Sequence, residues 1–216
     1  GRIDSSLLDE VVNITEWPSA IKGSFAPEYL SLPQDLLETI MVHHQRYFPV
    51  QKENSGNHKN NGENNLLPFF ITISNNDLKE ARDSIRQGNE RVLRARLADG
   101  KFFYYDDQKK KLSERVSDLK ELTYQHGLGN YLDKRERLLK LSEKLIDAIN
   151  LDTIQAEHLK TTLILCKLDL VTNLVGELPE LQGYVGSWYA REEGQPEPVV
   201  KAIASHYAPR HTDDSI

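Results

Sequence analysis

The hydrophobic pattern of the first 46 residues predicts two short helices around an extended segment. Apolar positions in residues 4–16 recur every three or four residues, which is the spacing of one helix face. Trp17-Pro18 ends this helix, and residues 20–25 have the composition of a strand. A second helix is expected from Pro33, since proline suits the first turn of a helix.

The next segment predicts a pair of strands and then a long helix. Residues 47–51 and 67–74 are rich in aromatic and β-branched side chains, as strands are, and a polar, Asn-rich and Gly-rich loop over residues 53–65 joins them. Asp77 can cap a helix that runs from Leu78 to about Phe103.

The rest of the chain is predicted to be helical. A polar break at 106–111 precedes helices over about 113–126, 131–149, 153–175 and 197–207. The fold class is therefore expected to be α+β. Residues 1–105 would form an α+β domain with a small antiparallel sheet, and residues 106–216 an all-helical domain.

The composition of the chain excludes several classes of protein. The net charge of −6 argues against a general nucleic-acid coat protein, although a local basic surface stays possible on an acidic body. Cys166 is the only cysteine, so neither an internal disulfide nor a Cys-based zinc site is expected. No apolar stretch approaches the roughly 20 residues of a membrane helix. Because the chain starts at Gly1 and stops in polar sequence, we expect a segment of a longer protein.

Five arginines lie in the predicted long helix, and helical geometry divides them. Arg91 and Arg94 project away from the apolar arc, which makes them candidates for phosphate contacts, whereas Arg96 projects within the arc and is expected to form a structural ion pair. Ordinary charge decoration of a solvated helix is the alternative. The five are Arg82, Arg86, Arg91, Arg94 and Arg96.

Two further segments carry polar residues that we expect to be structural. His43-His44 precedes Arg46 at a helix end, where adjacent histidines cannot face one metal, although Arg46 could touch RNA. Glu177, Glu180 and Gln182 lie around Pro179 and are typical of a shaped turn. No complete active site is recognisable, so no catalytic residue and no metal ligand is assigned.

The helix expected over 153–175 is apolar on most sides, which is typical of a central helix. Lys167 and Asp169 interrupt it, and a buried charge needs a partner or shifts its pKa toward neutrality. Either one of them is catalytic, or one lies at the rim and the other is paired inside.

Several motifs, in one order, resemble the β subunit of bacterial-type glycyl-tRNA synthetase, and together they span most of the chain. They are His44-Gln-Arg-Tyr-Phe-Pro49, Leu67-Pro-Phe-Phe-Ile-Thr-Ile-Ser-Asn75, Gly88-Asn-Glu-Arg-Val-Leu-Arg-Ala-Arg-Leu-Ala-Asp99 with Lys101-Phe-Phe-Tyr104, Lys167-Leu-Asp-Leu-Val-Thr172 with Glu177-Leu-Pro-Glu-Leu-Gln-Gly183, and Ser205-His-Tyr-Ala-Pro-Arg210.

The resemblance implies an internal segment of an α2β2 enzyme that joins glycine to its tRNA. ATP and Mg²⁺ would be used at the α subunit, and this segment would bind no cofactor. Its partners would be the α subunit and tRNA(Gly), with neither membrane nor DNA, in the cytoplasm or, for a plastid protein, the stroma. The residues expected to contact tRNA are Arg46, Arg91, Arg94 and Lys101.

The helical part also resembles an HD-type domain, whose active members bind a metal through adjacent His and Asp residues. Here Cys166 and Lys167 would occupy those two positions, and a lysine would repel a divalent cation, so a degenerate HD domain without metal is expected. Two alternatives stay open. One is an HD-type metal-dependent phosphohydrolase, in which His126, His158 or His206 would converge with Asp169, and the other is a purely structural assembly module.

Overall fold

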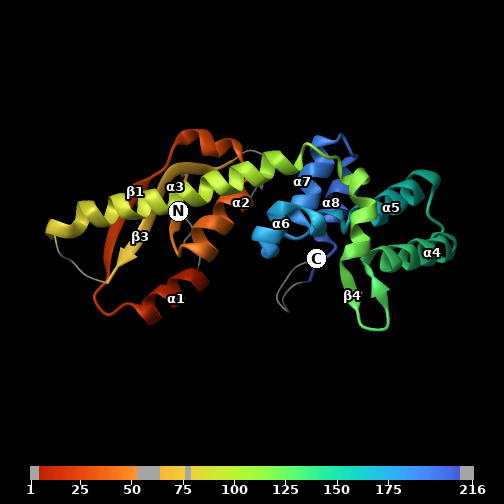
Figure 1. The fold of residues 1–216 in the computed structure, drawn as a ribbon, viewed down its shortest axis with the longest axis horizontal. Helices are drawn as coiled ribbons and strands as arrows, with labels where there is room; N and C mark the ends of the chain where they lie inside the picture. The colour runs from red at the N-terminus through yellow and green to blue at the C-terminus, as the bar shows by residue number, and fades with distance from the viewer. Residues whose placement is uncertain (1–4, 53–63, 76–78, 210–216) are drawn as a thin grey trace. The chain divides into compact units, whose positions relative to one another are not determined.

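The computed structural model describes residues 5–52, 64–75 and 79–209, and it divides into two compact units, Gly1–Phe102 and Phe103–Ile216 (Figure 1). The long helix α3, Arg82–Asp107, supplies residues to both units. The division falls near the predicted domain boundary at 105/106, which also lies within α3.

A three-stranded antiparallel sheet forms the centre of the first unit, in the order β1-β3-β2. The strands are β1 (Ser19–Ser24), β2 (Phe48–Gln51) and β3 (Leu66–Ser74). Central β3 pairs Ile21 with Thr72 on one side and Phe48 with Ile71 on the other. The predicted strand pair and the small antiparallel sheet are therefore confirmed. Most of the predicted loop over 53–65 lies outside the described residues.

Helices complete the first unit, and α3 runs beside the edge strand β1. The Ser24 backbone N–H donates to Glu90 Oε1 at 2.9 Å, and Arg82 Nη2 donates to the Ala20 carbonyl at 2.5 Å, so α3 side chains satisfy backbone groups of that edge. The other helical elements are α1 (Ser5–Ile14), η1 (Pro27–Ser31), α2 (Gln34–Glu38), the π-helix η2 (Thr39–His44) and η3 (Lys79–Ala81).

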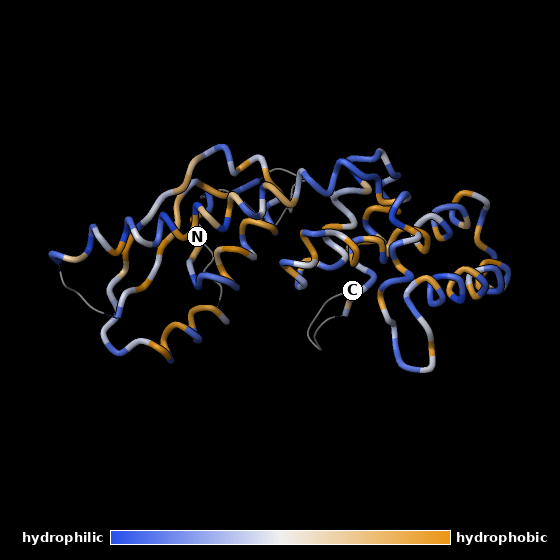
Figure 2. The backbone as a smooth tube through the Cα atoms, viewed as in Figure 1, coloured by the Kyte–Doolittle hydropathy of each residue, from blue (hydrophilic) through white to orange (hydrophobic). Residues whose placement is uncertain are grey.

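The second unit is mainly helical, with one small hairpin (Figure 1). Its elements are η4 (Leu112–Glu121), β4 (Thr123–Gln125), β5 (Gly129–Asn130), α4 (Tyr131–Ile149), α5 (Thr153–Leu165), η5 (Leu168–Val171), α6 (Asn173–Glu177), η6 (Pro179–Leu181), α7 (Tyr184–Glu192) and α8 (Glu197–Ser205). The α+β fold class is confirmed, and along α4 and α5 hydrophobic and hydrophilic residues alternate (Figure 2).

Two predicted helices of this unit are wrong. The predicted helix 113–126 is a 3-10 helix followed by the strand β4, and the predicted helix 153–175 ends at Leu165. The most buried helix is α7, in which every residue from Val185 to Ala190 is buried. The prediction of a central helix over 153–175 is therefore corrected to a shorter α5 with α7 at the core.

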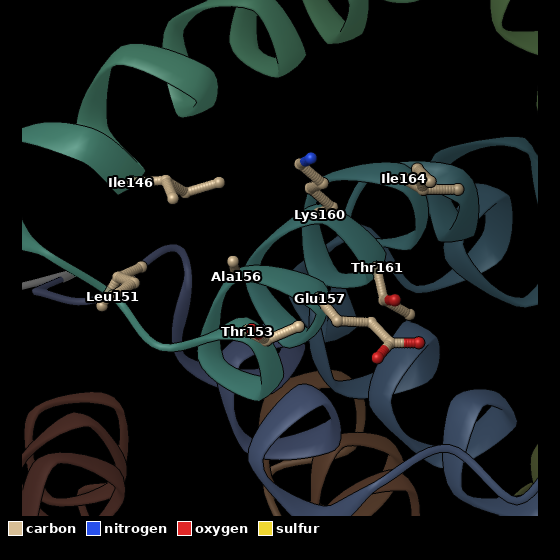
Figure 3. A pocket seen from close by; sticks show the side chains of 8 residues that line it. All are labelled: Ile146, Leu151, Thr153, Ala156, Glu157, Lys160, Thr161 and Ile164. Atoms are coloured by element: carbon tan, nitrogen blue, oxygen red, sulfur yellow. The ribbon is translucent and has the colours of Figure 1, made fainter.

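The helices α4 and α5 are joined by residues 150–152, and an open groove lies between them. The groove has a volume of about 490 Å³, and Figure 3 shows Ile146 of α4 directed toward the space beside Ala156 and Lys160 of α5. Its floor and walls are mostly apolar or small, so the two helices are not fully packed against each other along this edge.

Candidate nucleic-acid interface

The solvent side of α3 carries the two arginines that sequence spacing singled out. Leu93 and Leu97 are fully buried, whereas Arg91 and Arg94 are exposed and lie three residues apart, as side-by-side neighbours on the helix surface. Neither arginine forms an ion pair or a hydrogen bond with another described residue. Their guanidinium groups are available to an anionic ligand.

The other candidate cations of the first unit already have carboxylate partners. Arg46 Nε donates to Glu10 Oε1 at 2.5 Å, and Lys101 Nζ lies 3.0 Å from Glu28 Oε1. Lys101 also lies 5.5 Å from the centre of the Tyr29 ring. A phosphate would have to compete with these pairs, so Arg46 and Lys101 are weaker anion ligands than Arg91 and Arg94.

Arg96 does not lie where the sequence spacing predicts. Its side chain is exposed, so the expected position against the core is wrong, while a structural ion pair for Arg96 stays a prediction. The buried stripe of α3 is narrow because Leu93, Leu97 and Gly100 form it, and Gly100 lies against Ile40. An arginine only ~60° from Leu93 can therefore still reach solvent.

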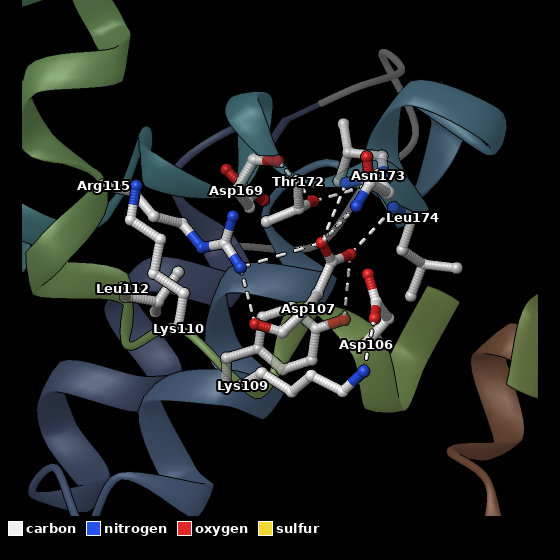
Figure 4. Close-up of polar contacts among 12 residues, drawn as sticks. Asp106, Asp107, Lys109, Lys110, Leu112, Arg115, Asp169, Thr172, Asn173 and Leu174 are labelled. Carbon is white, nitrogen blue, oxygen red and sulfur yellow. Dashed lines mark hydrogen bonds and ion pairs between the residues drawn. The ribbon is translucent and has the colours of Figure 1, made fainter. Parts of the chain in front are cut away.

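A buried carboxylate at the end of α3 organises the second unit. Asp107 accepts hydrogen bonds from the backbone N–H groups of Asn173 at 3.0 Å and Leu174 at 2.9 Å, so its carboxylate caps the start of α6 (Figure 4). Arg115 donates to the Asp107 carbonyl at 2.5 Å and lies 3.7 Å from its Oδ1. The Tyr189 hydroxyl lies 3.5 Å from Oδ2.

This network is structural in character. Both Asp107 and Arg115 are buried, and burial beside the Asp107 charge raises the pKa of the Tyr189 hydroxyl. The sequence indicates only a polar break at Asp107 and not this network, because the partners of Asp107 are 66 and 67 residues away along the chain. No local pattern marks such a pairing.

Asp169 is the other fully buried acid of this unit. Its Oδ2 accepts from the backbone N–H of Gly183 at 2.6 Å and of Gly186 at 3.3 Å, and its Oδ1 has no partner among the described residues. Burial raises the pKa of Asp169 to about 6. A Cβ at Gly186 would lie 3.2 Å from Asp169 Cγ, so the missing side chain lets α7 approach the carboxyl group.

Lys167 lies nearer the surface and pairs with His206. The Nδ1–H of His206 donates to the Ile203 carbonyl at 2.6 Å, which leaves Nε2 to accept from Lys167 Nζ at 2.8 Å. Nζ also lies 3.6 Å from the Tyr207 ring centre, and burial lowers the pKa of Lys167 to about 8. Lys167 thus lies toward the rim, with Asp169 bonded inside, which is the structural arrangement of the two considered from sequence.

No metal centre forms among the residues that the structure describes. Within residues 5–52, 64–75 and 79–209, no three His, Cys, Asp or Glu side chains are grouped so that they could hold an ion. His206 is bonded to Lys167, and Cys166 lies at the end of α5 rather than within a central helix. The described part of the chain also contains no helix long and apolar enough to cross a membrane.

Comparison with known proteins decides the family. A family model described as glycyl-tRNA synthetase beta subunit matches residues 1–216. The chain belongs to this family. Similar proteins are the glycine–tRNA ligase beta subunits of Gloeothece citriformis, at 46% identity over 212 residues, and of Bacillus subtilis, at 42% over 208 residues. The matches cover 98% and 96% of this chain but only 29% of either relative.

Membership of the glycyl-tRNA synthetase beta subunit family confirms the resemblance seen in the motifs. The chain spans under a third of the length of these relatives, so the properties of a whole β subunit do not transfer to it automatically. The expected HD-type domain, with Cys166 and Lys167 at its former ligand positions, stays a prediction.

Proposed function

We propose that this chain is a non-catalytic segment of a glycyl-tRNA synthetase β subunit that supports tRNA binding and α2β2 assembly. Attachment of glycine to tRNA(Gly), with ATP and Mg²⁺, would take place at the α subunit. Family membership supports the setting, and the exposed, unpaired Arg91 and Arg94 support the tRNA contact.

The charge distribution of the chain explains why Arg91 and Arg94 are the proposed phosphate contacts. The chain has a net charge of −6, so it cannot attract RNA through bulk charge. Affinity for phosphates must then come from local cations, and a guanidinium without a carboxylate partner binds phosphate without first breaking an ion pair. Arg91 and Arg94 meet this condition on α3, whereas Arg86 lies 3.1 Å from Asp83.

The test is tRNA binding by the whole α2β2 enzyme with Arg91→Ala and Arg94→Ala combined. Two lost phosphate contacts should weaken binding and reduce the slope of log K against log salt by about 1.4 to 1.8. Arg86→Ala on the same helix is the matched control and should leave both quantities unchanged. Equal affinity and slope in the double variant would exclude this interface.

The assembly part of the proposal has its own test. Mixing the chain with the α subunit in the absence of tRNA should give a complex in analytical ultracentrifugation, and the Arg91→Ala, Arg94→Ala chain should form it equally well. No complex in either case would leave tRNA binding as the function, whereas loss of the complex only in the variant would reassign the arginines to the α subunit.

A further inference from the structure

The helix α4 exposes a row of large aliphatic side chains. Leu141, Leu145 and Ile149 are 60%, 44% and 56% exposed, and Leu138 is half-buried. Their spacing of three, four and four residues places them within an arc of ~80° on one side of the helix. We call these four residues the α4 stripe.

The unit itself is packed through the side of α4 that adjoins the stripe. Ser142 is buried and Ile146 lines the groove toward α5, while α4 makes its remaining contacts with η4 and the β4–β5 hairpin. Leu141, Leu145 and Ile149 therefore add little to this core, and only Leu138 of the stripe is half-buried. Several adjacent exposed leucines on one helix face are typical of a surface that another element covers.

The α4 stripe continues into the α4–α5 groove. Ile149 lies three residues after Ile146, so the two side chains are neighbours on the helix surface, and Ile146 lies across the groove from Ala156 and Lys160 (Figure 3). Stripe and groove form one continuous surface along α4 from Leu138 to Ile149, and the groove is lined by four apolar residues together with Thr153, Glu157, Lys160 and Thr161. A second helix could lie along such a surface.

Charges on α4 are sorted around this surface. Arg137 and Lys144 lie ~80–100° from Leu145 on the edge away from the groove, both are exposed, and neither makes an ion pair with a described residue. Glu143 and Asp147 lie on the opposite side of the helix. The apolar surface is thus bordered by positive charge, which complements an acidic edge.

This surface of α4 fits a protein helix better than it fits RNA. Phosphate binding needs the basic edge but not a row of exposed leucines, whereas a docked amphipathic helix uses both. Relatives of this chain are more than three times its length, so most of a β subunit lies outside these 216 residues and must pack on some surface.

We propose that the α4 stripe and groove receive an amphipathic helix with an acidic edge from the part of the β subunit outside this chain. Its apolar residues would pack on Leu141, Leu145 and Ile149, and its carboxylates would pair with Arg137 and Lys144. The inference concerns the interior of the β subunit and does not depend on the tRNA contacts of α3.

Site-specific cross-linking in the full-length β subunit within the α2β2 enzyme tests this. A photoreactive residue replaces Leu145, and the matched control places it at Glu143, two residues away on the opposite face of α4. Mass spectrometry should find a cross-link from position 145 to an acidic helical segment of the same subunit outside the present chain. Position 143 should give no such product.

Every other product overturns the proposal. These are a cross-link from position 145 to the α subunit, to a second β subunit, to tRNA, to residues of this chain itself, or no cross-link at all. A second measurement uses Arg137→Glu with Lys144→Glu, which should lower the cross-link yield at position 145 about threefold. An unchanged yield would remove the acidic edge from the proposed partner.

The same substitutions made in the 216-residue chain and in the full-length subunit distinguish a docking surface from part of the folded core. Leu141→Lys with Leu145→Lys should change the melting temperature of the 216-residue chain only slightly, because the two leucines are 60% and 44% exposed in it. The same pair in the full-length subunit should lower it. A drop in the short chain would show that the stripe belongs to the core of this unit, and equal stability in both would show that nothing covers it.

Discussion

The tip of the Phe70 ring lies against Gly23, its cross-strand neighbour in the β1–β3 pair. A Cβ at position 23 would collide with three atoms of that ring. Phe70 is fully buried and its ring stacks on Tyr47, with ring centres 4.6 Å apart. The absent side chain of Gly23 thus makes room for the aromatic pair at the centre of the first unit.

Gly23→Ala should therefore destabilise the first unit. Displacing a ring held between a strand and Tyr47 is overpacking, which costs about 1–3 kcal/mol of unfolding free energy. Gly88→Ala is the control, because nothing lies within 4 Å of its added Cβ and an exposed helix position should gain about 0.5–1 kcal/mol. Chemical denaturation measures both, and equal effects would contradict the role of Phe70.

Asp107→Ala should strongly destabilise the second unit. The change uncaps α6 and leaves the Arg115 guanidinium buried without its carboxylate, a loss of about 3–5 kcal/mol. Asp106→Ala, one residue earlier, removes only an exposed pair with Lys109 and should cost less than about 1 kcal/mol. Thermal unfolding distinguishes the two, and similar melting temperatures would contradict the network.

Asp169 should make stability fall as the pH rises. Its pKa is about 6 in the fold against 3.8 as the ordinary value, so between those pH values the folded state binds more protons and loses stability with rising pH. The expected loss is on the order of 3 kcal/mol, complete above pH 6. Asp169→Asn should remove it, so the difference between variant and parent should change from pH 4 to 7. A constant difference would contradict the shift.

Lys101→Ala should reduce tRNA affinity less than Arg94→Ala. The two positions lie seven residues apart on the same side of α3, but only Lys101 is held by a carboxylate, Glu28, at 3.0 Å. Filter binding of tRNA to the whole enzyme at two salt concentrations compares them. A larger effect of Lys101→Ala would show that the Glu28 pair opens in the complex.

Helices with local start signals could be predicted closely from sequence. The predicted starts at 131 and 153 coincide with α4 and α5, because Asn130 with Asp133 and Asp152 with Gln155 form capping boxes within four residues. The strand pair was predicted for a similar reason, since aromatic and β-branched residues mark β2 and β3 directly.

Features that depend on distant partners could not be predicted. The chain leaves α5 after Leu165 so that Asp169 can meet the backbone of Gly183 and Gly186, and no pattern within residues 153–175 indicates this. Nor does spacing mark α7, because its residues from Val185 to Ala190 are all buried and so show no polar face. Of the candidate site, spacing predicted the outward direction of Arg91 and Arg94, but not which cations are paired.

The Asp107 carboxylate also depends on residues that are synthesised later than it is. Its capping partners, Asn173 and Leu174, are 66 and 67 residues further along the chain. At the usual translation rate a ribosome needs about 3 to 13 s to reach them, and until then α6 does not exist to be capped. The second unit therefore cannot finish folding until residues 173 and 174 have been synthesised, and by then all residues of the sheet and of α3 have already been added to the chain.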